Sequence, residues 1–176
     1  MSFLSSLPGK TSLMDVAKKF VESYRLLDAY HTHAMHSPSP LTPAERELIA
    51  AHVSRLNGCE YCVGIHTASA ELLGIDRALL DGLPASAEGP LVNAKLRAAL
   101  SFARKLTEGP RRMAQADADA LYAAGWDERA LYDIVSVTAL YNLYNRLVEG
   151  LGVEAGPEYY RAAAERLTKA VREPRA

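Results

Sequence analysis

Apolar side chains recur every three or four residues along most of this chain, and no stretch alternates convincingly between apolar and polar positions. Spacings of three and four place side chains on one face of an α-helix, whereas a strand repeats every second residue. The first repeat covers about residues 13–35 and runs through Val16, Phe20, Tyr24 and Leu27. The pattern therefore predicts an all-α fold that begins with one long helix.

Residues that start and stop helices divide the rest of the chain. Thr42, Pro43 and Glu45 combine an N-cap, a proline at the first helical position and a capping box, and the helix they start should end at Asn57-Gly58. Asp127 is a good cap for a later helix. Further helices are predicted over residues 59–73, 91–106, 116–124, 128–151 and 158–171, with a proline- and glycine-rich loop around residues 83–90.

The chain has 176 residues, which suits one domain with a buried core. Residues 1–12 contain Pro8, Gly9 and four serines and are predicted to form an N-terminal arm, followed by a single helical domain over residues 13–176. The formal net charge of −1, without a long basic run, argues against nucleic-acid binding and electrostatic membrane attachment. No run of eighteen apolar residues and no signal-peptide pattern occurs, so a cytoplasmic location is expected.

The only two cysteines, Cys59 and Cys62, stand at the start of a predicted helix. In a reducing compartment such a pair indicates catalysis or metal binding rather than a structural disulfide. Free N–H groups and the helix dipole favour a thiolate at this end of a helix, and thiolate is the nucleophile. His66 lies one turn beyond Cys62 on the same face and could take its proton directly or through one water. The dipole favours Cys59 as the attacking thiol and the histidine favours Cys62; we expect Cys62 to attack and Cys59 to resolve.

Glu47 lies twelve residues before Cys59, inside the preceding predicted helix. Ala50, Ala51 and Ser54 share its face, and such small residues allow two helices to approach closely. A carboxylate that points across this contact could orient His66 or hold the water that relays its proton. We therefore expect Glu47 to belong to the same site.

The resulting motif, Glu-x11-Cys-x2-Cys-x3-His, resembles that of the alkylhydroperoxidase D-like (carboxymuconolactone decarboxylase) superfamily. Residues 38–47, 141–146 and 151–154 are similar to its subgroup of peroxidase-related enzymes. The resemblance implies a helical homo-oligomer with the cysteine pair in a helical pocket, Cys62 as the peroxide-attacking cysteine, Cys59 as the resolving one, and Glu47 and His66 in a proton relay. In the best-known member a histidine directly precedes the second cysteine, and Tyr61 stands at that place here.

These observations predict a thiol-dependent peroxidase that reduces organic hydroperoxides through a Cys59–Cys62 dithiol/disulfide cycle and is restored by a dithiol or protein reductant. We expect no cofactor, no metal, no nucleic acid and no membrane as partner. Two alternatives remain open. One is a redox-sensing or disulfide-exchange protein with little turnover, and the other is a helical metal-binding protein with Cys59, Cys62, His66 and Glu47 as ligands.

Several other residues are interpreted by their place in the predicted helices. Tyr61 and Trp126 are expected to pack, and the histidines at positions 31, 33 and 36 are expected at a solvated helix end. Asn142, Asn145 and Arg146 are expected to cap helices or to bridge helices or subunits, with direct substrate contact as the less favoured alternative.

Overall fold

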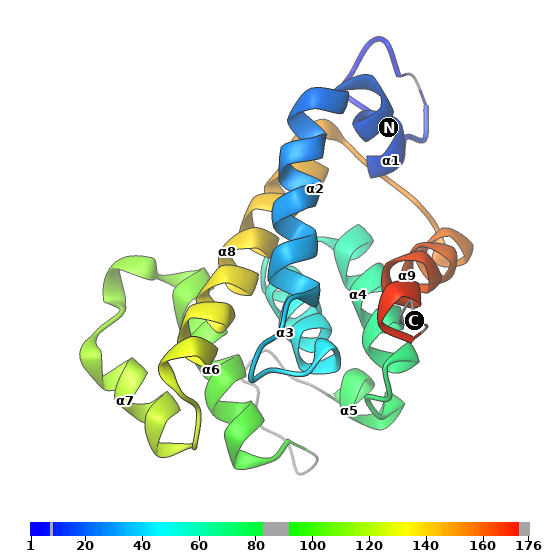
Figure 1. Ribbon diagram of the computed structural model, residues 1–176. Helices are drawn as coiled ribbons and strands as arrows, with labels where there is room; N and C mark the ends of the chain where they lie inside the picture. Colours follow the sequence, from blue (N-terminus) through cyan, green and yellow to red (C-terminus); the bar gives the residue numbers. More distant parts are fainter. Residues whose placement is uncertain (8, 83–91, 173–176) are drawn as a thin grey trace.

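The computed structural model describes residues 1–7, 9–82 and 92–172, and every regular element in these residues is helical, as predicted. In Figure 1 the long helix α8 crosses the molecule with α2 beside it, and α9 lies against α4. The helices are α1 (Leu13–Lys19), α2 (Val21–His36), α3 (Pro43–Leu56), α4 (Glu60–Leu72), α5 (Arg77–Gly82), α6 (Ala94–Glu108), η1 (Pro110–Arg112), α7 (Gln115–Ala123), α8 (Glu128–Leu151) and α9 (Pro157–Arg172).

Local capping fixes the starts of the two helices that matter most for the site. The Thr42 side chain accepts from the Glu45 backbone N–H, and the Glu45 carboxylate accepts from the Thr42 N–H at 2.8 Å, so the predicted capping box of α3 is present. Asp127 accepts from the Ala130 N–H at 2.7 Å and caps α8 as expected. Both starts follow from residues a few positions apart in the sequence.

The single helix predicted over residues 13–35 is wrong in one respect, because it is divided into α1 and α2 at Phe20. Phe20 has φ −115° and ψ 55°, outside the helical region, although it is neither glycine nor proline. Its N–H still donates to the Val16 carbonyl, and its carbonyl accepts from the Tyr24 N–H, so few backbone bonds are lost. The bend lets α1 bury Val16 and Ala17 while α2 follows another direction. Packing, rather than a local breaker, ends α1.

Smaller differences concern the middle of the chain. The predicted loop over residues 83–90 and the predicted helix start at Leu91 lie outside the described residues. The helix itself begins at Ala94, because the Asn93 side chain caps it by accepting from the Leu96 N–H at 2.8 Å. The short elements α5 and η1 were not predicted, since neither is long enough to show a helical repeat.

A three-residue turn joins α3 to α4 and sets the position of the cysteines. Gly58 has φ +70°, a left-handed conformation that glycine adopts at little cost. The Asn57 side chain donates to the Asn142 and Asn145 side chains of α8, at 3.1 and 2.9 Å. These bonds tie the turn to α8, so the helix-bridging role expected of the two asparagines is confirmed.

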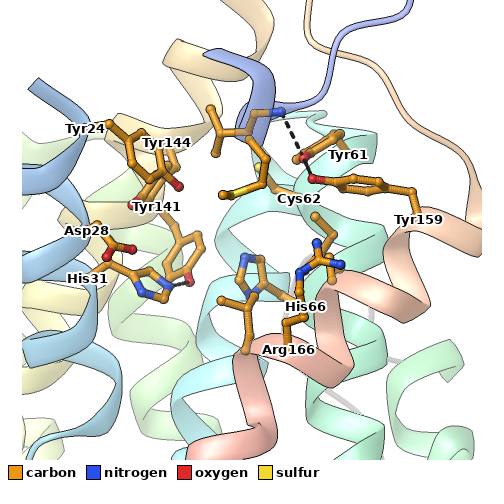
Figure 2. A pocket seen from close by; sticks show the side chains of 15 residues that line it. Tyr24, Asp28, His31, Tyr61, Cys62, His66, Tyr141, Tyr144, Tyr159 and Arg166 are labelled. Atoms are coloured by element: carbon orange, nitrogen blue, oxygen red, sulfur yellow. Dashed lines mark hydrogen bonds between the residues drawn. The ribbon is translucent and has the colours of Figure 1, made fainter. Parts of the chain in front are cut away.

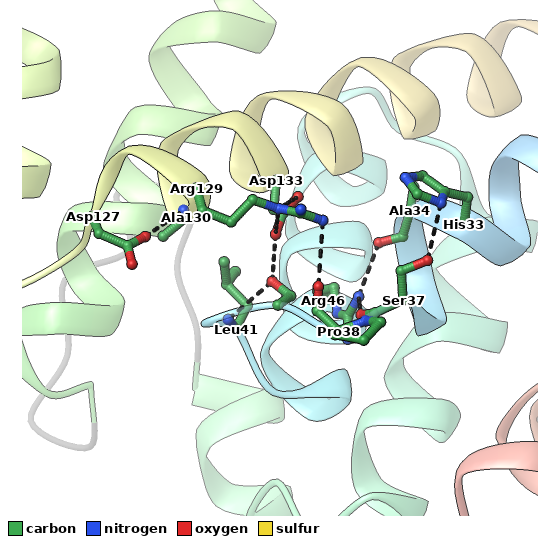
Figure 3. Close-up of polar contacts among 11 residues, drawn as sticks. His33, Ala34, Ser37, Pro38, Leu41, Arg46, Asp127, Arg129, Ala130 and Asp133 are labelled. Carbon is green, nitrogen blue, oxygen red and sulfur yellow. Dashed lines mark hydrogen bonds and ion pairs between the residues drawn. The ribbon is translucent and has the colours of Figure 1, made fainter.

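The end of α2 is held by a polar network at its junction with α3 and α8 (Figure 3). The buried Arg46 of α3 donates to the Ser37 carbonyl at 2.9 Å, which satisfies the end of α2. Ser39 donates to the Asp133 carboxylate of α8, which also accepts from Arg129 at 3.0 Å. The network holds the C-terminal end of α2 and the segment after it against α3 and α8.

The buried apolar residues form two clusters. The larger lies mainly between α3, α6 and α8 and includes Trp126, which packs as expected and donates from Nε1 to the Lys95 carbonyl. The smaller surrounds the cysteines and joins α4 to α1, α9 and the end of α8. Gly64 of α4 lies against the Tyr160 ring of α9, where any side chain would clash. Across the described residues, each helix is too short or too polar to cross a membrane.

Candidate active site

The two cysteines lie at the beginning of α4 but have different surroundings. Cys59 is the N-cap residue and Cys62 is the third residue of the helix, so both stand near free backbone N–H groups. Both are free thiols. Cys59 is fully buried, whereas Cys62 is 4% exposed and, of the two, is the one that lines a pocket in the described part of the chain. A small molecule in this pocket therefore meets Cys62 first.

The pocket has a volume of about 110 Å³ and lies between α1, α2, α4, α8 and α9 (Figure 2). Its walls are mostly apolar and aromatic, with one acidic and one basic side chain, Asp28 and Arg166, contributed by α2 and α9. Five tyrosines line it: Tyr24, Tyr61, Tyr141, Tyr144 and Tyr159. Such a lining favours small organic molecules with an apolar body.

Glu47 and His66 form a buried pair, of which His66 lines the pocket. The distance between Glu47 Oε2 and His66 Nδ1 is 2.6 Å, and the residues are 2% and 6% exposed. The contact joins α3 to α4, and the small residues Ala50 and Ser54 of the α3 face are fully buried. A carboxylate accepts a hydrogen bond from Nδ1–H, so it selects the imidazole tautomer whose Nε2 carries the lone pair. That nitrogen is then free to accept a proton.

The neighbouring groups shift the pKa values of the two thiols in opposite directions. A hydrogen bond from the Cys59 thiol lowers the pKa of Cys62; burial opposes this, while His66 and the Asn145 amide add to it. The same Cys59–Cys62 hydrogen bond, followed by burial, raises the pKa of Cys59. The thiolate therefore forms on Cys62, the cysteine that faces the pocket.

Asn145 reaches the cysteines, a contact that was not expected from the sequence. It is 1% exposed, donates to the Ser54 hydroxyl at 3.0 Å and also reaches Cys62 from α8. Its amide thus supports the Cys62 thiolate as well as the turn before α4. Two asparagines three residues apart on one helix face were the available sequence signal, but the sequence does not show that this face meets the cysteines.

Tyr61 packs, as expected, and its hydroxyl is already bonded. The hydroxyl accepts from the Leu13 backbone N–H at 3.2 Å and donates to the Tyr159 hydroxyl at 3.1 Å. It therefore satisfies a free N–H in the first turn of α1 and connects that helix to α9. Tyr61 holds two walls of the pocket together.

The expectation of a solvated helix end is wrong for His31. His31 is 7% exposed, because α2 packs along α8 and turns this residue toward Tyr141. The distance between His31 Nε2 and the Tyr141 hydroxyl is 3.2 Å, and burial lowers the pKa of His31 to about 3. His33 is exposed and His36 is half-buried. Within the described residues, no group of three His, Cys, Asp or Glu side chains is arranged to hold a metal ion.

Comparison with known proteins places this chain in a family. The Carboxymuconolactone decarboxylase family matches residues 22–105. A crystal structure of an uncharacterized peroxidase-related protein from Silicibacter sp. TM1040 is 31% identical, with a TM-score of 0.75 and coverage of 80% of this chain and 73% of that one. A second, described as an alkylhydroperoxidase AhpD core and an uncharacterized peroxidase-related protein from Ralstonia eutropha JMP134, is 27% identical, with a TM-score of 0.79 and coverage of 84% and 78%.

A relative in Bacillus subtilis (strain 168), the uncharacterized protein YdfG, is 27% identical over 117 residues, which are 66% of this chain and 80% of YdfG. The family match over residues 22–105 covers α3, the turn after it and α4, which carry Glu47, the two cysteines and His66. The helical fold, the site on its α3–α4 pair and the similarity to these proteins lead to one conclusion. This chain belongs to the carboxymuconolactone decarboxylase family of AhpD-like proteins.

Proposed function

We propose that this protein is a thiol-dependent peroxidase that reduces organic hydroperoxides through a Cys59–Cys62 dithiol/disulfide cycle. One observation carries the proposal: Cys62 opens into a tyrosine-lined pocket that His66 also lines, with Cys59 beside it. The peroxidase-related descriptions of two similar structures point to the same class of chemistry.

The cycle begins when His66, oriented by Glu47, accepts the proton of Cys62 directly or through a water. The Cys62 thiolate attacks one peroxide oxygen, the O–O bond breaks, and Cys62 becomes a sulfenic acid while the hydroperoxide becomes an alcohol. Cys59 then attacks the Cys62 sulfur, and water leaves as the disulfide forms. An external dithiol reduces the disulfide and supplies two electrons and two protons.

The pocket supports an organic hydroperoxide as the substrate. Its volume of about 110 Å³ and its aromatic walls fit a small molecule with an apolar body. The burial of Cys59 directs the external dithiol toward Cys62, the sulfur that the pocket reaches. We further propose that the protein acts without a bound cofactor and as a homo-oligomer.

The proposal is tested by exchanging each cysteine for serine. Cys62→Ser should abolish both peroxide consumption and disulfide formation, because the attacking thiolate is gone. Cys59→Ser should still consume one equivalent of peroxide and leave a sulfenic acid that a dimedone probe traps, but should not form the internal disulfide. The measurements are thiol titration and intact mass after tert-butyl hydroperoxide, with dihydrolipoamide as reductant. Unchanged peroxide consumption in Cys62→Ser would remove the proposal.

A second candidate, a redox-sensing or disulfide-exchange protein with little peroxidase turnover, is favoured by Tyr61. This residue stands where the best-known member of the resembled family has a histidine, and its hydroxyl is bonded to Leu13 and Tyr159. The proton relay therefore lacks the histidine that the family member has at this position. The two candidates differ in turnover with excess dithiol: a peroxidase consumes many equivalents of hydroperoxide per chain, whereas a sensor is oxidised once and is restored slowly.

A further inference from the structure

The pocket contains a polar pair that the proposed cycle does not use. Tyr141 of α8 and His31 of α2 lie with 3.2 Å between the hydroxyl oxygen and Nε2. They are 1% and 7% exposed, and both line the pocket into which Cys62 opens. The Tyr141 ring also lies edge-on to that of His66, with 4.4 Å between the ring centroids. Figure 2 shows Cys62, His66 and this pair around the same space.

The Tyr141–His31 pair can stabilise the charge that develops when a peroxide is cleaved. When the O–O bond breaks, negative charge develops on the departing oxygen, and a fixed donor in a water-poor pocket stabilises that charge most effectively. Burial raises the pKa of Tyr141 well above its usual value, so the phenol remains a neutral hydrogen-bond donor. His31 is neutral because burial lowers its pKa. With its proton on Nε2, His31 donates to the Tyr141 oxygen and leaves the phenol proton to point into the pocket.

Resting on the proposed peroxidase function, we propose that Tyr141 is a catalytic residue that donates a hydrogen bond to the leaving oxygen, and that His31 positions it. The Cys62 sulfur bonds to the terminal peroxide oxygen, which keeps its hydrogen. The electron pair of the broken O–O bond remains on the alkoxide oxygen. That oxygen then takes the proton that His66 removed from Cys62. Cys62 is oxidised, the hydroperoxide is reduced, and Tyr141 keeps its own proton throughout.

Leaving-group dependence distinguishes this role from a structural one. Tyr141→Phe keeps the ring and removes the donor, so its single-turnover rate should fall about a hundredfold with tert-butyl hydroperoxide, whose alkoxide is a poor leaving group. With peracetic acid the fall should be small, because acetate leaves without help. Hydrogen peroxide should lie between them. Rates are measured by stopped-flow thiol loss, with the pKa of thiol alkylation and the melting temperature recorded for each variant.

Two further comparisons test the separate contributions of the Tyr141 hydroxyl and of His31. Tyr144→Phe removes another hydroxyl from the same pocket and should change the three rates by one common factor. His31→Ala should reproduce the leaving-group dependence of Tyr141→Phe, whereas His31→Gln, whose amide can donate to the Tyr141 oxygen, should restore part of the rate. A glutamine variant no better than alanine would remove His31 from the proposal.

The outcomes separate this inference from the function on which it rests. Equal losses with all three oxidants in Tyr141→Phe, or no loss, would overturn the role of Tyr141 while leaving the peroxidase function intact. A wild-type protein that reacts with none of the three oxidants would overturn both.

Discussion

Two buried histidines on neighbouring helices have opposite surroundings. His66 of α4 is held by the Glu47 carboxylate at 2.6 Å and lines the pocket. His52 of α3 is fully buried, and no carboxylate is bonded to either of its ring nitrogens among the residues that the structure describes. Burial, followed by the positive charges of Arg55 and Arg104, lowers the pKa of His52 to about 4.

The comparison shows what a charged partner adds to a buried imidazole. A carboxylate selects one tautomer and stabilises the imidazolium that forms when the other nitrogen accepts a proton. Without such a partner, burial keeps the ring neutral, and the ring behaves as a packing group. His66 of α4 is therefore a candidate base beside the pocket, whereas His52 of α3 makes the stability of the protein depend on pH.

The largest effect is expected when the partner of His66 loses its charge. Glu47→Gln should lower the rate of the Cys62 thiol with peroxide by roughly ten- to a hundredfold, because glutamine does not stabilise the imidazolium. The apparent pKa of thiol alkylation should rise for the same reason. Both are measured by stopped-flow kinetics and by a pH profile with iodoacetamide.

A matched control lies on the same helix. Glu45→Gln alters the capping box of α3 at a residue that does not line the pocket, and should leave the thiol pH profile unchanged. A Glu47→Gln profile that coincides with that of Glu45→Gln would show that the carboxylate does not assist the thiol.

The next effect is on stability in acid rather than on a rate. The unfolded chain protonates a histidine near pH ~6.5, but folded His52 does so only near pH 4. The unfolded state therefore binds more protons between these values, and stability falls as pH decreases from ~6.5 to 4, by roughly 3 kcal/mol for this residue. His52→Leu should flatten the pH dependence over this window, measured by urea unfolding at several pH values.

His31 provides the internal comparison for that experiment. Burial also lowers the pKa of His31, to about 3. The His52→Leu variant should therefore retain a residual loss of stability as pH falls toward 3. An acid slope in His52→Leu identical to that of the wild type would mean that His52 is not held neutral in the folded protein.

The smallest effect is expected at Tyr61. Tyr61→Phe removes the hydroxyl that bonds Leu13 and Tyr159, so the free energy of unfolding should fall by about 1–2 kcal/mol. Thermal unfolding measures this change. The pKa of thiol alkylation should move less than in Glu47→Gln, because the hydroxyl is bonded to the pocket walls. A larger shift than in Glu47→Gln would assign Tyr61 to the proton relay.

Short-range signals gave the all-α class and most helix positions. The Thr42 capping box and the Asp127 cap act through bonds to backbone groups three residues away, so they can be recognised without knowledge of the rest of the fold. Long-range packing set the break at Phe20, which carries no local signal, and short elements such as α5 show no repeat.

The sequence by itself determined that two thiols and an imidazole follow one another on a single helix, because the spacing of three and four residues fixes their relative placement. Together with the motif, it also pointed to Glu47. Only the tertiary structure decided that Cys62 rather than Cys59 faces a pocket, that Asn145 supports its thiolate, and that His31 meets Tyr141 there. Those relations join helices distant in the chain, and they depend on the faces that packing brings together.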